Sequence, residues 1–264
     1  MLTKTSEKFR AVYGPVKSWR YGRSLGIDPI GPVSTCSFNC VYCQLGEIEQ
    51  KTNKRSVFVP TKQILSELAE FPTSEVDVIT LSGSGEPTLA TNLDEILIGI
   101  KKQTDKPKLV LTNGTTLNNP EVRYALGFAD KVSVKIDGVT FRKWLGIDRP
   151  VPGVNFADIW EGIHKFKNEF RGEMSIQTMI LSPWDTLDKV EYIGLIKSLM
   201  PSEVQLNTPS RPKPLKRQLD GRGNHSQERD YEVQQLKCVS SDVLGKFASE
   251  IYKNTKIPVR YKED

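Results

Sequence analysis

The chain has 264 residues, 38% of them hydrophobic and 26% charged, so it is long enough to bury the core of one sizeable α/β domain. Its 37 lysines and arginines face 32 aspartates and glutamates, and the net charge of +5 permits a nucleic-acid partner without arguing for one. No apolar run reaches the roughly 18 residues of a membrane-spanning helix, and the N-terminus has no apolar segment typical of a secretory signal. Four cysteines, three of them clustered, suit a reducing compartment better than a disulfide framework. We therefore expect a cytoplasmic protein without membrane contact.

Past residue 23, short β-rich runs alternate with amphipathic helical runs, which is typical of a parallel sheet. The predicted strands, in chain order, are Ser24–Ile30, Val76–Leu81, Lys108–Leu111, Lys131–Ile136, Met174–Ile180 and Glu203–Leu206, with a last strand at Ile257–Tyr261. The predicted helices are Thr61–Phe71, Leu93–Thr104, Pro120–Phe128, Phe156–Phe170, Leu187–Met200 and Asp242–Asn254. Six β/α units fall short of the eight that close a complete barrel. The predicted fold class is therefore α/β, an incomplete (β/α)6 TIM-like barrel with N- and C-terminal extensions.

This fold prediction divides the chain into three parts. Residues 1–23 form an N-terminal extension, residues 24–207 the barrel core, and residues 208–264 an irregular loop followed by a helix and a strand that pack on the barrel. The irregular part begins with the Pro- and Arg-rich stretch 208–217, which cannot form a regular helix because proline removes backbone donors. Two interpretations stay open for this stretch: a solvated loop, or a loop that grips substrate or acts as a lid.

The strongest functional signal is a loop with three cysteines, Cys36, Cys40 and Cys43, within eight residues. Three thiolates can hold a metal centre from one loop, and the fourth ligand is missing. Structural zinc sites close with four ligands, and iron–sulfur clusters usually take four cysteines. A three-cysteine loop therefore predicts a cluster with one iron left free to bind another molecule. The alternative is a structural zinc loop that uses the remote Cys238 as its fourth ligand.

Polar groups also follow the predicted strands at their C-terminal ends, where parallel barrels place their functional residues. In chain order they are the cysteine loop, Ser82–Thr88, Thr112–Gly114, the group Ser133, Lys135 and Asp137, then Gln177, and finally Gln205–Pro209. Because these ends meet at one rim, we expect the side chains to line one site. Lys135 is notable there, because strands of a parallel sheet are buried on both faces and tolerate few charges.

The CxxxCxxC pattern, with the aromatic Tyr42 before its last cysteine, resembles the radical S-adenosylmethionine (SAM) enzymes. The resemblance implies a partial barrel, with Cys36, Cys40 and Cys43 holding a 4Fe–4S cluster whose fourth iron binds SAM. It also implies that an electron from the cluster cleaves SAM to a 5′-deoxyadenosyl radical, which abstracts hydrogen from the substrate. A reductant of the flavodoxin or ferredoxin type follows from this chemistry.

The resemblance assigns further residues to the cofactor. Ser84-Gly85-Glu86 is similar to the GGE motif of these enzymes, in which the turn and its acidic residue meet the amino group of SAM, while Tyr42 packs near the cofactor. The remaining candidates for the SAM carboxylate, the ribose or the substrate are Asn113, Ser133, Lys135, Gln177 and Asn207.

A narrower resemblance joins the chain to the iron–sulfur oxidoreductase group related to the wyosine-base synthases, which rebuild a guanosine of tRNA. It is carried by the blocks 12–16, 22–28, 43–46, 82–89, 148–150 and 204–212. The archaeal wyosine-type synthases have extra cysteines ahead of the radical SAM loop for a second cluster. This chain has no cysteine before Cys36, so a second cysteine-bound 4Fe–4S cluster is excluded.

Three hypotheses remain open for function. The first is radical chemistry on an RNA base, with tRNA as a partner. The second is an epimerisation or rearrangement of a peptide or small molecule, with Cys238 as the hydrogen-atom donor if it points into the site; a buried cysteine that only packs is the plainer interpretation. The third is a non-catalytic, metal-stabilised RNA-binding module.

Overall fold

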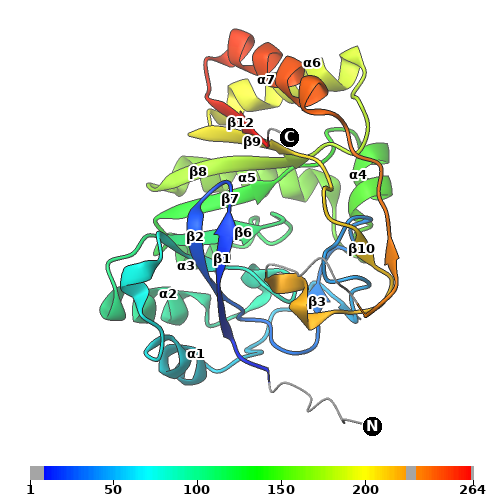
Figure 1. Cartoon of the computed structure of the whole chain (residues 1–264). Helices are drawn as coiled ribbons and strands as arrows, with labels where there is room; N and C mark the ends of the chain where they lie inside the picture. Colours follow the sequence, from blue (N-terminus) through cyan, green and yellow to red (C-terminus); the bar gives the residue numbers. More distant parts are fainter. Residues whose placement is uncertain (1–8, 224–229, 263–264) are drawn as a thin grey trace.

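A computed structural model describes residues 9–223 and 230–262 of the chain, so the first eight residues of the predicted N-terminal extension lie outside the described residues. One eight-stranded sheet curls through the molecule (Figure 1). Its strands, in spatial order, are β1 (Val12–Ser18), β2 (Gly22–Ile27), β5 (Val78–Leu81), β6 (Lys108–Thr112), β7 (Lys131–Lys135), β8 (Glu173–Met179), β9 (Glu203–Asn207) and β12 (Val259–Tyr261). Only β1 runs antiparallel to its neighbour; all other pairs in this sheet are parallel.

Helices follow the parallel strands and pack against the outer face of the sheet, except for the helix at Phe141–Asp148, which lies at the carboxyl ends of the strands beside the cysteine loop (Figure 1). They are α1 (Thr61–Leu68), α2 (Leu93–Gln103), α3 (Pro120–Leu126), α4 (Phe141–Asp148), α5 (Phe156–Glu169), α6 (Thr186–Leu199) and α7 (Ser241–Thr255). Alternation along β7 shows the two faces: Val132 and Val134 are fully buried in the apolar core, so Ser133 and Lys135 point to the inner face. The helix-covered face therefore stabilises the fold, and the inner face is free to carry polar groups.

Two small sheets and three short 3-10 helices complete the structure. Strands β3 (Thr35–Cys36) and β4 (Gln50–Lys51) form one pair, and β10 (Lys213–Pro214) and β11 (Val233–Gln234) form the other. The 3-10 helices are η1 (Thr73–Glu75), η2 (Pro87–Leu89) and η3 (Leu219–Arg222). None of the described helices is long and apolar enough to cross a membrane.

The predicted partial barrel of six β/α units is confirmed: β2, β5, β6, β7, β8 and β9 each lead into a helix. The first predicted strand, however, stops at Ile27. The carboxylate of Asp28 accepts hydrogen bonds from the N–H groups of Ile30 (3.0 Å) and Gly31 (3.1 Å), and these bonds turn the chain away from the sheet.

Among the strands of the main sheet and the α-helices, two elements were not predicted. Strand β1 pairs with β2 in the main sheet, although Gly14 and Pro15 interrupt its sequence and its register shifts there. Helix α4 is only eight residues long, and Thr140 caps it by accepting from the N–H of Lys143 (3.3 Å). Both elements bear on the site, because β1 brings a hairpin turn to the inner face and α4 ends at Asp148.

The stretch after β9 packs on the cysteine loop. The N–H of Gln218 donates to the Leu45 carbonyl (3.0 Å), and a Cβ on Gly46 would come within 2.4 Å of the Lys216 carbonyl oxygen. Arg217 donates to the Ser84 hydroxyl (2.9 Å) from the same stretch. A freely solvated loop does not make such contacts, so this stretch forms one wall over the cysteine loop.

Candidate functional site

The three clustered cysteines lie on the loop that follows β2, and this loop is tied to the turn at residues 84–86. The N–H of Thr35 donates to the Ser84 carbonyl (2.9 Å), and the Thr35 carbonyl accepts from the N–H of Glu86 (3.1 Å). Gly85 lies between these bonds with φ of +155°, and a Cβ there would come within 1.7 Å of the Thr35 carbonyl oxygen. Only glycine fits this approach. The sequence thus brings the cysteine loop and this turn together through the backbone.

The thiols of Cys36, Cys40 and Cys43 are half-buried and close enough to act on one another electrostatically. Burial raises the pKa of all three, that of Cys36 to about 12. The Cys36 sulfur accepts from the N–H of Phe38 (3.4 Å) and from the Asn113 side-chain amide (3.6 Å). A bound metal centre deprotonates such thiols and reverses their preference for the neutral form.

The donor set of this loop fits an iron–sulfur cluster. Within the described part of the chain, no three Cys, His, Asp or Glu side chains are close enough together to hold one metal ion. A cluster takes one cysteine for each iron, so its sulfur ligands do not have to meet at a single ion. The fourth zinc ligand of the alternative hypothesis, Cys238, is exposed and directs its thiol at the carbonyl of Pro209 (3.3 Å). Cys238 therefore directs its thiol at the stretch after β9 in this structure.

Glu86 is 2% exposed and holds the turn to the next strand. Its Oε1 accepts from the Thr88 N–H (3.1 Å), the Thr88 hydroxyl (2.6 Å) and the Thr112 hydroxyl (2.7 Å), and its Oε2 accepts from the Asn113 N–H (2.6 Å). Burial raises the pKa of this carboxyl, and the hydrogen bonds partly oppose that shift. Each carboxylate oxygen has about two lone-pair positions, and Oε2 accepts only one hydrogen bond here, so Oε2 keeps room for one more donor.

Asn113 connects the Glu86 region to the cysteine loop. Its side-chain amide donates to the Ser37 hydroxyl (3.0 Å) as well as to Cys36, and its Oδ1 accepts from the N–H (3.0 Å) and hydroxyl (2.8 Å) of Thr115. Every polar atom of this side chain has a partner within the protein. Asn113 therefore orients the first cysteine of the loop.

Lys135 lies beneath the cysteine loop in a buried ion-pair network. Its ammonium group pairs with Asp148 and with Asp137 (3.0 Å), and it lies 4.9 Å from the centre of the Phe38 ring. Asp137 accepts from the hydroxyl of Tyr42. Burial opposes the charge on Lys135, but the two carboxylates outweigh burial and hold its pKa well above the usual range.

Asp148 was not among the predicted site residues. It ends α4, and its carboxylate accepts from the Cys40 thiol (3.7 Å) as well as from Lys135; burial raises its pKa to about 6. The block at 148–150 was the only sequence signal, because nothing local predicts that α4 returns to the cysteine loop. Asp148 thereby joins the second cysteine to β7.

The inner face of β7, β8 and β9 carries the remaining predicted residues. Ser133 is 2% exposed, and its hydroxyl has no hydrogen-bond partner. Gln177 stands beside Lys135 in the register and donates to the Tyr21 hydroxyl (3.3 Å). Asn207 ends β9 and accepts from the N–H of Thr208 through its side chain (2.9 Å). These residues share one face, but no direct contact joins Asn207 to the cysteine loop in the described structure.

Cys238 is not the buried packing cysteine of the plainer interpretation. Its side chain is exposed. The neighbouring N–H of Val239 donates to the Thr208 hydroxyl (3.0 Å), one residue after β9 ends. Cys238 is therefore near the rim at which the parallel strands end.

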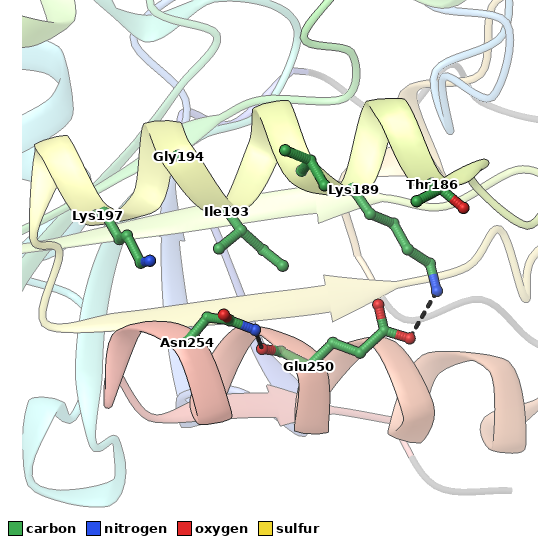
Figure 2. A pocket seen from close by; sticks show the side chains of 8 residues that line it. Thr186, Lys189, Ile193, Gly194, Lys197, Glu250 and Asn254 are labelled. Atoms are coloured by element: carbon green, nitrogen blue, oxygen red, sulfur yellow. Dashed lines mark hydrogen bonds and ion pairs between the residues drawn. The ribbon is translucent and has the colours of Figure 1, made fainter.

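A groove of about 570 Å³ lies elsewhere, between α6 and α7 (Figure 2). Lys189 and Glu250 face each other across it in an ion pair of 2.8 Å, and Asn254 donates to the backbone carbonyl of Glu250 (2.8 Å). None of the predicted site residues lines this groove. We therefore do not assign the predicted chemistry to it.

Known proteins resemble this chain in sequence and in fold. Residues 30–194 match the model of the radical SAM superfamily. The chain is 58% identical to the UPF0026 protein slr1464 of Synechocystis sp. over 254 residues, which is 96% of each chain. It is 28% identical over 145 residues to a probable GTP 3′,8-cyclase of Saccharolobus islandicus, covering 52% of this chain and 45% of the relative.

Among solved structures, the chain is similar to SuiB of Streptococcus suis bound to S-adenosylmethionine, with a TM-score of 0.61 at 11% identity. The match covers 88% of this chain and 49% of SuiB, so this chain spans about half the length of that protein, and the likeness concerns the fold. Together with the cysteine loop and the partial barrel, the family match shows that the chain belongs to the radical SAM superfamily of enzymes.

Proposed function

We propose that the protein holds a 4Fe–4S cluster on Cys36, Cys40 and Cys43 and uses it to cleave SAM. When bound, the cluster supplies the electron that splits SAM into methionine and a 5′-deoxyadenosyl radical, which takes hydrogen from the substrate. The observation that carries this proposal is the three-thiol loop locked by Gly85 to the turn that ends in Glu86.

Several residues of this chain suit the binding of SAM. The Oε2 atom of Glu86 has room for one more donor, which the methionyl amine would supply, and the Ser84 and Gly85 backbone approaches the same region. The unpartnered hydroxyl of Ser133 suits an oxygen atom of the carboxylate or ribose. Lys135 already has two carboxylate partners, so we assign it to positioning Tyr42 and Asp148 around the cysteine loop.

For the substrate we propose an RNA base, with tRNA as the partner and a flavodoxin- or ferredoxin-type protein as the reductant. The net charge of +5 is compatible with RNA. One relative is named for a reaction of GTP, a guanine nucleotide. The resemblance to the wyosine-related group points in the same direction.

The test is an anaerobic assay of the reconstituted, reduced enzyme with SAM, with and without bulk tRNA, in which 5′-deoxyadenosine is quantified. We expect 5′-deoxyadenosine to rise when tRNA is added. Cys40→Ala is the control for cluster dependence and should form none. Equal production with and without tRNA would reject RNA as the substrate while keeping the SAM chemistry. Failure of the wild type to bind SAM would reject the whole proposal.

A second candidate is an epimerisation in which Cys238 returns a hydrogen atom to the substrate radical. The exposure of Cys238 near the rim favours it. In this reaction the S–H bond breaks, a C–H bond forms on the substrate, and a thiyl radical remains that an external electron and proton from the reductant system restore. Cys238→Ala should then abolish deuterium incorporation from heavy water into the product but leave SAM cleavage intact. Unchanged incorporation would reject this candidate.

A further inference from the structure

The turn between β1 and β2 reaches across the inner side of the curled sheet. The hydroxyl of Tyr21 donates to Gln205 on β9 (3.1 Å) and accepts from Gln177 on β8 (3.3 Å). Arg260 on β12 donates to the backbone carbonyl of Arg20 (3.0 Å). Because β1 and β12 are the two edges of the sheet, this turn joins one edge to the other (Figure 1). The position of Arg20 is therefore fixed by three strands of the far edge.

The side chain of Arg20 has no partner for its buried donor. Its Nε is buried without a hydrogen bond, and its guanidinium lies over the rings of Trp19 (5.6 Å) and Tyr21 (6.0 Å). Burial lowers the pKa of Arg20, and the ionisable groups that act on it most are Tyr21, Arg211, Tyr42 and Arg260, none of them a carboxylate. Because Tyr42 belongs to the cysteine loop, the guanidinium lies within electrostatic reach of the candidate site.

Three other arginines near the site are paired with carboxylates. Arg217 pairs with Glu49 (3.3 Å), Arg222 with Asp28 (2.9 Å) and Arg260 with Glu203 (2.6 Å). A buried donor without a partner, next to further positive charge, costs stability. An anion that accepts from this guanidinium would remove that cost, because the planar donor fork of arginine matches the oxygen atoms of phosphate and carboxylate groups.

We propose that Arg20 binds an anionic oxygen group of the substrate, either a phosphate or a carboxylate, at the inner face of β8 and β9. The inference rests on the proposed function and deepens it, because it names a chemical feature of the substrate. The aromatic rings of Trp19 and Tyr21 hold the guanidinium in place, and the hydrogen bonds of Tyr21 fix the turn.

The test uses the reconstituted, SAM-bound holoenzyme and two small probes, inorganic pyrophosphate and acetate, titrated by calorimetry at constant ionic strength. Arg20→Gln should weaken binding of the preferred probe by about tenfold or more, since a hydrogen bond to a charged group is lost. Arg20→Lys should be intermediate, because it keeps the charge without the fork. Arg23→Gln is the matched control: Arg23 is on the same hairpin but is exposed and pairs with Glu75 (3.1 Å), so binding should not change.

Tighter binding of pyrophosphate would identify a phosphate-bearing substrate, and tighter binding of acetate a carboxylate-bearing one. The absorbance of the cluster and the affinity for SAM should stay unchanged in Arg20→Gln, which shows that the variant is folded. The proposal is overturned if the wild type binds neither probe at millimolar concentrations, or if Arg20→Gln binds them as the wild type does. Failure of the wild type to bind SAM, with anion binding still dependent on Arg20, would reject the proposed function but support the anion site.

Discussion

Glu86 and Ser133 are equally buried, at 2% exposure, but their hydrogen bonding differs completely. The carboxylate of Glu86 accepts four hydrogen bonds from the protein, whereas the hydroxyl of Ser133 makes none. The Ser84–Glu86 turn is thus held mainly by the chain itself, with one acceptor position on Oε2 left over. The inner face of β7–β9 carries the unpartnered hydroxyl of Ser133, and the β1–β2 turn that bonds to β8 and β9 carries the unpartnered Nε of Arg20. This side of the molecule has the properties of a surface that receives a ligand.

Gly85→Ala is expected to have the largest effect on stability, and it tests whether the Ser84–Glu86 turn holds the cysteine loop. The added Cβ would come within 1.7 Å of the Thr35 carbonyl, at a φ that disfavours side chains, so we expect a loss of about 3 kcal/mol or more in the free energy of unfolding. Urea unfolding and iron content after reconstitution measure the effect. Gly194→Ala is the control, since nothing lies within 4 Å of its Cβ in helix α6, and it should stabilise by about 0.5–1 kcal/mol. Equal iron content and stability in Gly85→Ala and the wild type would show that the turn does not hold the loop.

Glu86→Gln keeps the shape of the side chain but replaces one acceptor oxygen with a donor group, so it tests the hydrogen bonds of the turn. The threonine hydroxyls can rotate to accept from an amide, but the N–H of Thr88 or of Asn113 must lose its acceptor. We expect the free energy of unfolding to fall by about 2 kcal/mol, as for one buried donor left unsatisfied. Glu70→Gln, which removes an exposed ion pair with Arg10, should change it by less than about 0.5 kcal/mol. A Glu86→Gln variant as stable as the wild type would contradict a structural role for this carboxylate.

The pH dependence of the stability that Glu49 contributes tests its bonds to Ser34, just ahead of the cysteine loop, and to Arg217 in the stretch that covers this loop. Its pKa is lowered chiefly by the N–H of Ser34 (2.8 Å), with help from Arg217 (3.3 Å). A carboxyl with a lowered folded-state pKa stabilises the protein above its unfolded value of about 4.3, and this contribution disappears as the pH falls through the folded value. Glu49→Gln should therefore cost about 0.5 kcal/mol at neutral pH, a small figure because the side chain is partly exposed, and less in acid. Urea unfolding of Glu49→Gln and of the wild type, at neutral pH and in acid, measures this difference in stability. If Glu49→Gln cost more stability in acid than at neutral pH, the lowered pKa of Glu49 would be contradicted.

Local sequence patterns predicted the barrel and the radical SAM superfamily, and both predictions are confirmed. Apolar strands such as Val78–Leu81 alternate with amphipathic helices such as Leu93–Gln103, and both patterns are local. The three cysteines lie within one loop, so their spacing alone predicted that they act together. Strand β1 was missed because Gly14 and Pro15 break the local strand pattern, and its pairing with β2 overrides that break.

The polar network around the cysteines could not be predicted in the same way. Lys135 and Asp148 are thirteen residues apart and meet only because α4 returns to the cysteine loop. Arg20 lies within electrostatic reach of Tyr42 only because β12 and β9 hold the β1–β2 turn. Such contacts depend on how distant elements close on each other, and no periodic pattern records them. The roles of Glu86, Ser133, Gln177 and Asn207 toward SAM or the substrate stay predictions.

The smallest expected change in stability comes from Ser133→Ala, which tests the inner face of β7–β9. Removing a buried hydroxyl without a partner also removes its desolvation cost, so the free energy of unfolding should stay within about 0.5 kcal/mol of the wild type or rise slightly. If this hydroxyl forms a hydrogen bond with SAM as proposed, Ser133→Ala should lower the affinity for SAM by about three- to tenfold, as for the loss of one neutral hydrogen bond. Urea unfolding and calorimetric titration of SAM measure the two effects separately.

Thr178→Val provides the opposite case within the same sheet. The Thr178 hydroxyl bonds to the hydroxyl of Tyr192 (2.6 Å), and both residues are buried. Its removal leaves Tyr192 unpaired and should cost about 1 kcal/mol, with no change in the affinity for SAM. A ligand-receiving hydroxyl affects binding without affecting stability, and a scaffold hydroxyl does the reverse. If Ser133→Ala lost stability and kept full affinity for SAM, Ser133 would belong to the scaffold, and the contrast between the two regions would fail at that residue.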